Sequence, residues 1–132
     1  SLDVDTIVAK DISGLWDIDL SDYYLAGVRE PHKSIKQLYV NAGVMLLNLK
    51  KLRESGKGDE MIDSLNFKHY DFNEQDCINE LCQGGVLQIP GDYNQSDWTE
   101  PTATPKIIHF AAKKYYQDNS IVTMYRNMDW PR

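Results

Sequence analysis

Two aspartates near the start of the chain, Asp3 and Asp5, are separated by a single residue in the segment LDVDTIV. The apolar and partly β-branched residues around them predict a buried strand that ends at the acidic pair. Side chains at positions i and i+2 of a strand face the same side, so both carboxylates are predicted to converge on one divalent cation. Oxygen ligands of this kind suit Mg²⁺ and Mn²⁺. The alternative is a pair of solvated residues at the end of a strand.

The composition describes an acidic chain with enough apolar residues for one packed domain. It has 132 residues, 42% of them hydrophobic, and a formal net charge of −6 from 14 basic and 20 acidic side chains. This hydrophobic content supports a folded core. The negative charge disfavours nucleic acid or an anionic membrane as the main partner. An anionic ligand would therefore need a metal ion or a local basic cluster.

The cysteines and the length of the apolar runs indicate the cellular compartment of the protein. Cys77 and Cys82 are too few and too widely spaced for a Cys-x-x-Cys site, and we expect small buried thiols in a reducing compartment. The longest apolar run, 42–47, is too short to span a bilayer. The sequence thus predicts a cytoplasmic protein without a transmembrane segment, either free or peripheral at the inner face of the membrane.

Strand and helix signals alternate along the chain and predict an α/β fold. A helical turn is expected over Asp11–Asp19, with inward-facing Ile12, Leu15, Trp16 and Ile18. The predicted strands are Leu25–Val28, a segment that begins at Val40, Val86–Ile89 and Lys106–Phe110. The first predicted helix is Leu49–Glu54, which ends at Ser55 and Gly56. A second helical segment is indicated by the spacing of Met61, Ile62 and Leu65. The third is Glu74–Gln83, which is capped by Asn73 and has Ile78, Leu81 and Cys82 facing inward. Asp92–Pro105 is predicted to be a long loop with a functional role.

Five segments follow one another in an informative order: Leu2–Val8, Leu15–Leu20, Tyr39–Leu49, Glu74–Asp76 followed by Asn79, and Ile107–Phe110. In this order and spacing they resemble glycosyltransferase family 8, the retaining enzymes that use nucleotide-sugar donors. The segment YVNAGVMLLNL is the most specific of them. The resemblance implies a Rossmann-like nucleotide-diphospho-sugar transferase fold. It covers residues 1–114, as the carboxy-terminal part of a catalytic domain, and leaves 115–132 as an aromatic tail of uncertain placement.

The resemblance also implies a metal site. Asp3 and Asp5 match the acidic pair that holds Mn²⁺, or Mg²⁺, against the diphosphate of a UDP-sugar. His109 matches the third protein ligand, which comes from a distant strand end. The alternative for a lone histidine is a structural role in the core. Lys113 or Lys114, which lie closer to His109 than the lysine of the family motif, could add a cation at the same diphosphate, and a solvated basic face is an equal alternative.

Further residues are assigned to the sugars by the same resemblance. Asn41, Ala42 and Gly43 match a turn against the donor sugar, where a residue without Cβ permits close approach of a ligand or simply a tight bend. Glu74 and Gln75 match a polar pair at the reacting face of the sugar, and an ordinary first helical turn is the alternative for Glu74. Glu30 lies near an acidic position close to the acceptor.

The implied function is transfer of a hexose, glucose or galactose, from a UDP-sugar to a saccharide or glycoconjugate acceptor in carbohydrate biosynthesis, with Mn²⁺. Since an amide such as that of Gln75 is a poor nucleophile, front-face attack is favoured over a covalent intermediate. A catalytically inactive interaction module is the alternative. A metal-dependent phosphohydrolase is disfavoured because the sequence offers no second acidic cluster and no evident nucleophile.

The sequence also departs from the family pattern. Ala112 replaces a glycine of the last motif, its Pro-Trp pair is missing, and Glu74 replaces an aspartate. The amino-terminal βα units that carry the uridine-binding residues are not in this sequence. We therefore expect a partial fold that is inactive by itself, weak binding of nucleotide sugar by this chain alone, and exposed sheet edges that favour a homodimer or a swapped dimer.

Overall fold

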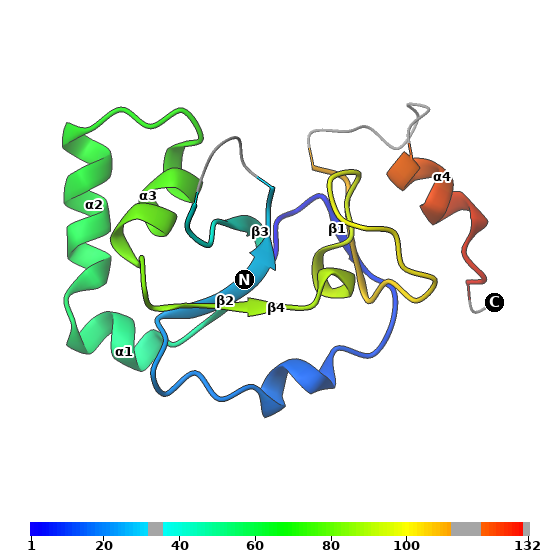
Figure 1. Ribbon diagram of the computed structural model, residues 1–132, viewed down its shortest axis with the longest axis horizontal. Helices are drawn as coiled ribbons and strands as arrows, with labels where there is room; N and C mark the ends of the chain where they lie inside the picture. Colours follow the sequence, from blue (N-terminus) through cyan, green and yellow to red (C-terminus); the bar gives the residue numbers. More distant parts are fainter. Residues whose placement is uncertain (32–35, 112–119, 131–132) are drawn as a thin grey trace.

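The structure, a computed structural model, describes residues 1–31, 36–111 and 120–130. Within these ranges the chain forms two small β-sheets with helices beside them (Figure 1). The strands are β1 (Thr6–Val8), β2 (Leu25–Arg29), β3 (Val40–Leu47), β4 (Val86–Ile89) and β5 (Ile107–His109). The helices are α1 (Leu49–Glu54), α2 (Lys57–Phe67), α3 (Asn73–Leu81) and α4 (Ser120–Asn127), with 3₁₀ turns η1 (Ser13–Asp17) and η2 (Gly91–Asn94).

The larger sheet has the strand order β3-β2-β4. The central strand β2 pairs antiparallel with β3 and parallel with β4, and the parallel connection runs through α1, α2 and α3. Successive side chains of β2 point to opposite faces. Leu25 packs with Val40 and Cys82 and with partly buried side chains of the three helices, whereas Ala26 packs with Ile89 and Tyr93 on the other face. Both faces of the sheet are therefore covered.

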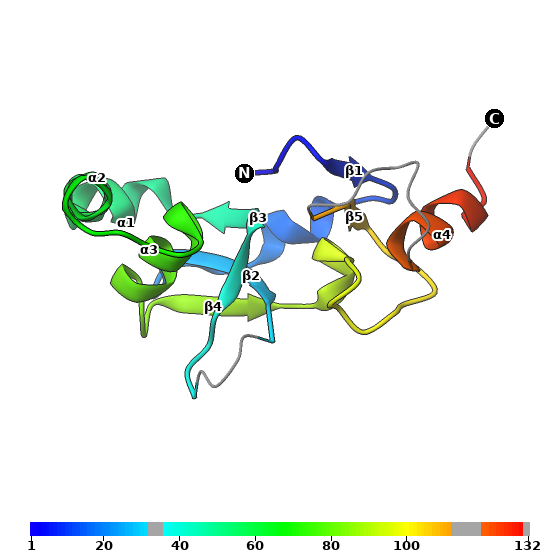
Figure 2. The same cartoon turned by 90° about the horizontal axis from the view of Figure 1, so that it is seen from above.

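The smaller sheet consists of β1 and β5, which pair antiparallel with Thr6 opposite His109. Behind it, Ile108 and Phe110 pack against Ile121 and Val122 of α4. Figure 2 shows α4 beside this pair of strands, at the opposite end of the molecule from α1–α3. The tail, which the sequence does not place, thus supplies a helix to the second core. The predicted boundary between residues 114 and 115 lies outside the described residues.

The position of the acidic pair corrects the prediction of a buried strand over 2–8. The strand β1 begins only at Thr6, so Asp3 and Asp5 precede it in a turn. The backbone N–H and the hydroxyl of Thr6 both donate to the carbonyl of Asp3, which closes that turn. Leu2 and Val4 are exposed rather than buried. The side chains still converge, but through the turn and not through the period of a strand.

Most of the other predicted elements are confirmed. The strand from Val40 runs into a helix over Leu49–Glu54, and Gly56 beyond it has a positive φ of 71°. The predicted cap at Asn73 is wrong: Asn73 lies inside α3 with φ 42°, and the carboxylate of Asp76 accepts from the backbone N–H of Phe72. Trp16 was predicted to face inward and is instead 82% exposed.

Ile12, Leu15 and Ile18 pack on the sheet as expected. Both cysteines are buried free thiols, as predicted. No helix among the described residues has the length and the apolar content needed to cross a membrane.

Candidate metal and sugar site

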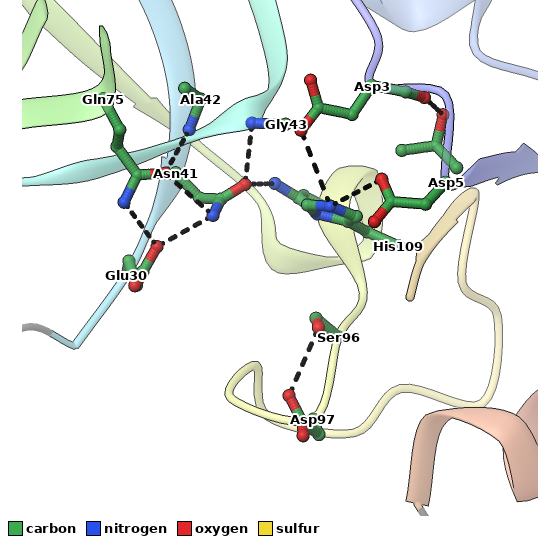
Figure 3. Close-up of polar contacts among 12 residues, drawn as sticks. Asp3, Asp5, Glu30, Asn41, Ala42, Gly43, Gln75, Ser96, Asp97 and His109 are labelled. Atoms are coloured by element: carbon green, nitrogen blue, oxygen red, sulfur yellow. Dashed lines mark hydrogen bonds and ion pairs between the residues drawn. The ribbon is translucent and has the colours of Figure 1, made fainter. Parts of the chain in front are cut away.

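The two predicted halves of the metal site meet between the two sheets (Figure 3). Nε2 of His109 lies 3.3 Å from Oδ1 of Asp5 and 3.9 Å from Oδ2 of Asp3. One ligand atom from each of the three residues lies within 4.8 Å of the other two. Three ligand atoms this close together could all bind one cation placed between them.

Backbone hydrogen bonds from three segments hold this cluster. The backbone N–H of Asp3 donates to the carbonyl of Gly43 on β3, at 2.8 Å. The carbonyl of Asp5 accepts from Phe110, the residue after β5, at 3.0 Å. His109 is paired opposite Thr6 in the smaller sheet and donates its backbone N–H to Gln95. The turn at residues 3–6 is therefore clamped between β3 and the end of β5.

The donor set fits a hard divalent cation. Two carboxylates and an imidazole match the ligands that Mn²⁺ accepts, and carboxylates are the ligands that Mg²⁺ prefers. The side chain of His109 is 4% exposed, whereas those of Asp3 and Asp5 are 57% and 40% exposed. The histidine thus closes the buried side of the site, and the aspartates face solvent, from which a ligand with its own oxygen atoms could complete the coordination.

Asn94 lies behind the imidazole and belongs to none of the sequence motifs. Oδ1 of Asn94 lies 2.9 Å from Nδ1 of His109, and Asn94 is fully buried. Its Nδ2 donates to Oδ1 of Asn41 at 3.0 Å. The only signal in the sequence was its place in the 92–105 loop, which was predicted to be functional as a whole. Asparagines are common in loops, so the sequence alone does not predict a role for this one.

The imidazole of His109 leaves no room for a side chain at residue 43. A Cβ on residue 43 would overlap Cε1 of His109 and stand 2.7 Å from Nδ1 and 2.8 Å from Oδ1 of Asn41. The close approach that the sequence predicted at this glycine is present, and a side chain of the same protein makes it. Contact of residues 41–43 with a donor sugar stays a prediction.

A second group of polar side chains extends from Asn41. Its Nδ2 donates to Oε2 of Glu30 and to Oε1 of Gln75, at 2.8 and 3.1 Å. Oε1 of Gln75 also accepts from the backbone N–H of Ala42, and Nε2 of Gln75 donates to Glu30. The structure therefore brings Glu30, Asn41, Ala42 and Gln75 together, as Figure 3 shows.

Tyr39 holds Gln75 from the other side. Its hydroxyl accepts from Nε2 of Gln75 at 3.1 Å and donates to the carboxylate of Asp76 at 2.6 Å. Burial, together with the hydrogen bond to Asp76, raises the pKa of the Tyr39 phenol well above its ordinary value, so the phenol stays protonated and keeps donating. Gln75 thus has a single orientation, set by partners at both ends of its amide.

One predicted assignment is not joined to this network by any hydrogen bond of the described residues, and another lies outside those residues. Glu74 lies exposed in the first turn of α3, next to Gln75 in the sequence. Lys113 and Lys114 lie outside the described residues. The roles predicted for these three residues stay predictions.

Comparison with known proteins identifies the family to which this chain belongs. The family model described as glycosyl transferase family 8 matches residues 1–116. The chain belongs to this family, which confirms the resemblance found in the sequence.

Relatives and solved structures agree with that assignment. A putative glycosyltransferase of Haemophilus influenzae is 31% identical over 70% of this chain and 32% of its own length. The glycosyltransferase GlyA of Streptococcus pneumoniae is 32% identical over 98% of this chain and 20% of its own length.

The crystal structure of the glycosyltransferase GlyE of S. pneumoniae matches 98% of this chain and 39% of that chain, with 25% identity and a TM-score of 0.76. An active-site mutant of LgtC matches 89% of this chain and 54% of that chain, with 24% identity and a TM-score of 0.74. These neighbours confirm the predicted glycosyltransferase fold, and this chain spans about half or less of the length of each.

Proposed function

We propose that the whole protein containing this chain is a retaining, Mn²⁺-dependent hexosyltransferase that moves glucose or galactose from a UDP-sugar to a saccharide or glycoconjugate acceptor. The observation that carries the proposal is the meeting of Asp3, Asp5 and His109, which come from distant parts of the chain. Family membership supports the general activity. The crystal structure of the galactosyltransferase LgtC in complex with donor and acceptor sugar analogs supports sugar substrates.

In this proposal the three residues hold the cation, with His109 on the buried side and the two aspartates on the open side. The bound dication would offset the negative charge that develops on the leaving diphosphate. Lys113 and Lys114 are proposed to bind that same diphosphate. The charge of the cation also explains how an acidic chain could bind an anionic donor.

The polar group on the other side of Asn41 is proposed to face the sugars. Gln75 is restrained at both ends of its amide, which suits a residue that orients the donor sugar rather than one that attacks it. We therefore favour front-face substitution. The bond from sugar C1 to the diphosphate oxygen breaks, a bond from C1 to the acceptor oxygen forms, and the acceptor proton passes to the leaving phosphate.

Glu74 is proposed to contact the sugar from the start of α3, and Glu30 to contact the acceptor. One oxygen of Glu30 accepts from both Asn41 and Gln75, so an acceptor hydroxyl would meet the other oxygen. The intact ligand cluster argues for an enzyme over an inactive interaction module. Among the described residues no second group of acidic, His or Cys ligands is found, which argues against a two-metal phosphohydrolase.

Donor hydrolysis or transfer by the whole protein tests the proposal. With a UDP-hexose and Mn²⁺ we expect turnover that is lost in a chelator and restored by added Mn²⁺. The Asp5→Asn variant should lose about 100-fold or more in rate, because it removes one anionic ligand and the charge stabilisation that depends on it. The Asp63→Asn variant on the exposed face of α2 changes the net charge equally and should keep full activity. Turnover that survives both the chelator and Asp5→Asn would overturn the proposal.

A further inference from the structure

The donor and the acceptor of each hydrogen bond behind the metal site can be assigned, starting from a backbone N–H group. The N–H of Gly43 can only donate, and its acceptor at 2.8 Å is Oδ1 of Asn41. This identifies the oxygen and the nitrogen of the Asn41 amide. Its nitrogen must then face the carboxylate of Glu30, which can only accept when ionised. Both ends of the Asn41 amide therefore agree on one orientation.

The orientation of Asn41 determines that of Asn94. Oδ1 of Asn41 is an acceptor, so the atom of Asn94 that lies 3.0 Å from it must be the donor, Nδ2. Oδ1 of Asn94 is then left to face the imidazole of His109. The opposite orientation of Asn94 would place two amide oxygens against each other. At a fully buried residue such a clash is costly because water cannot intervene.

The orientation of Asn94 in turn determines which nitrogen of the His109 imidazole carries the proton. An amide oxygen 2.9 Å from Nδ1 requires a proton on that nitrogen. In the neutral ring the lone pair then lies on Nε2, the nitrogen that faces Asp3 and Asp5. A metal ligand of this kind needs a lone pair on the nitrogen that faces the cation, and an acceptor on the other nitrogen sets the tautomer.

We propose that Asn94 is the positioning residue of the metal site: it holds His109 with its proton on Nδ1 and the lone pair of Nε2 directed at the acidic pair. This inference rests on the proposed function, in which His109 binds the cation. Asn94 does not itself touch the cation, and nothing in the sequence motifs assigns it a role. The same Asn41 amide also donates to Gln75, so Asn94 links the metal ligand to the group proposed to face the sugars.

The test uses the whole protein with ¹⁵N-labelled histidine and measures the imidazole nitrogens by NMR in a buffer alkaline enough for a neutral ring. The His109→Gln variant identifies the His109 signals. We expect the unaltered protein to show the Nδ1-protonated tautomer. In a second measurement, titration with Mn²⁺ followed by electron paramagnetic resonance gives the dissociation constant for the metal alone.

Two substitutions separate the acceptor from the donor of Asn94. Asn94→Leu removes both, and we expect a mixture of tautomers and a dissociation constant for Mn²⁺ raised about 10- to 100-fold. Asn94→Asp keeps an acceptor for Nδ1 but sets an oxygen against Oδ1 of Asn41, so we expect the tautomer to stay, stability to fall, and the dissociation constant for Mn²⁺ to rise less than in Asn94→Leu. Asn48→Leu removes another asparagine with hydrogen bonds at both ends, the N-cap residue of α1 just after β3, and should change neither measurement.

The outcomes decide the inference separately from the proposed function. An Nε2-protonated ring in the unaltered protein would overturn it, even if Asn94→Leu does not fold. An Asn94→Leu variant that keeps both the tautomer and the Mn²⁺ affinity would also overturn it, as would equal losses of affinity in Asn94→Asp and Asn94→Leu. The NMR measurement needs neither sugar nor turnover. If the unaltered protein shows the expected tautomer but binds no Mn²⁺, the proposed metal dependence fails while the positioning role of Asn94 stands.

Discussion

At residue 43 the difference between hydrogen and a methyl group decides whether the imidazole of His109 can occupy its place. We predict that Gly43→Ala weakens Mn²⁺ binding and lowers sugar transfer, because the added Cβ would overlap His109 and must push it from the acidic pair. Overpacking of this kind costs about 1–3 kcal/mol of stability. Calorimetric Mn²⁺ titration and denaturant unfolding of the whole protein measure the two effects.

Gly58 is the matched control for that substitution. It lies in α2, and a Cβ there would meet no atom within 4 Å. Gly58→Ala should raise stability by about 0.5–1 kcal/mol, through better helix propensity, and leave Mn²⁺ binding unchanged. Equal metal affinity in Gly43→Ala and Gly58→Ala would show that the imidazole can move without loss.

Among the elements, α3 serves both the site and the core. Its first turn presents Gln75 to the network around Asn41, and its carboxy-terminal end carries Cys82 into the cluster with Leu25 and Val40. The amphipathic pattern of this helix was readable because burial repeats at helical spacing. Its start was not, because the carboxylate of Asp76 and the positive φ of Asn73 replaced the expected cap.

The buried end of α3 predicts a dependence of stability on pH. Burial raises the pKa of the Cys82 thiol from 9.0 to about 11. The unfolded chain therefore loses this proton before the folded chain does, so stability is complete below pH about 9 and falls as the pH rises to about 11. Urea unfolding between these values should show the fall, and Cys82→Ala should flatten it. The same slope in both proteins would assign the effect to other groups.

At the scale of the whole molecule, the site lies where the two sheets meet. Asp3, Asp5 and His109 belong to the smaller sheet and its leading turn, whereas Gly43 and Asn41 belong to the larger one (Figures 1 and 3). The bridge between Leu2 and Val44 joins the two at this point. In the larger sheet of the described residues, β3 and β4 are the edge strands. The predicted homodimer through such edges stays a prediction.

This chain matches only part of each related protein, which leads to a prediction about its binding of a UDP-sugar. This chain covers 20% and 32% of the two relatives described above, and 54% of LgtC. We predict that it binds a UDP-sugar weakly or not at all by itself, because its structural relatives extend well beyond the part that it matches and we expect uridine-binding residues in that further part. Calorimetry with Mn²⁺ checks this, with the whole protein as the positive control. A low-micromolar dissociation constant for the chain alone would contradict the prediction.

The sequence by itself determined the family, the α/β order of elements and the identity of the three proposed metal ligands. The order of elements was readable because hydrophobic period and turn residues are local properties of the chain, whereas the family and the proposed ligands came from the resemblance of its motifs. Only the tertiary structure decided that the acidic pair lies in a turn, that His109 requires the glycine at residue 43, and that Asn94 stands behind the imidazole. These facts depend on hydrogen bonds and contacts between segments far apart in the chain, which no local pattern records.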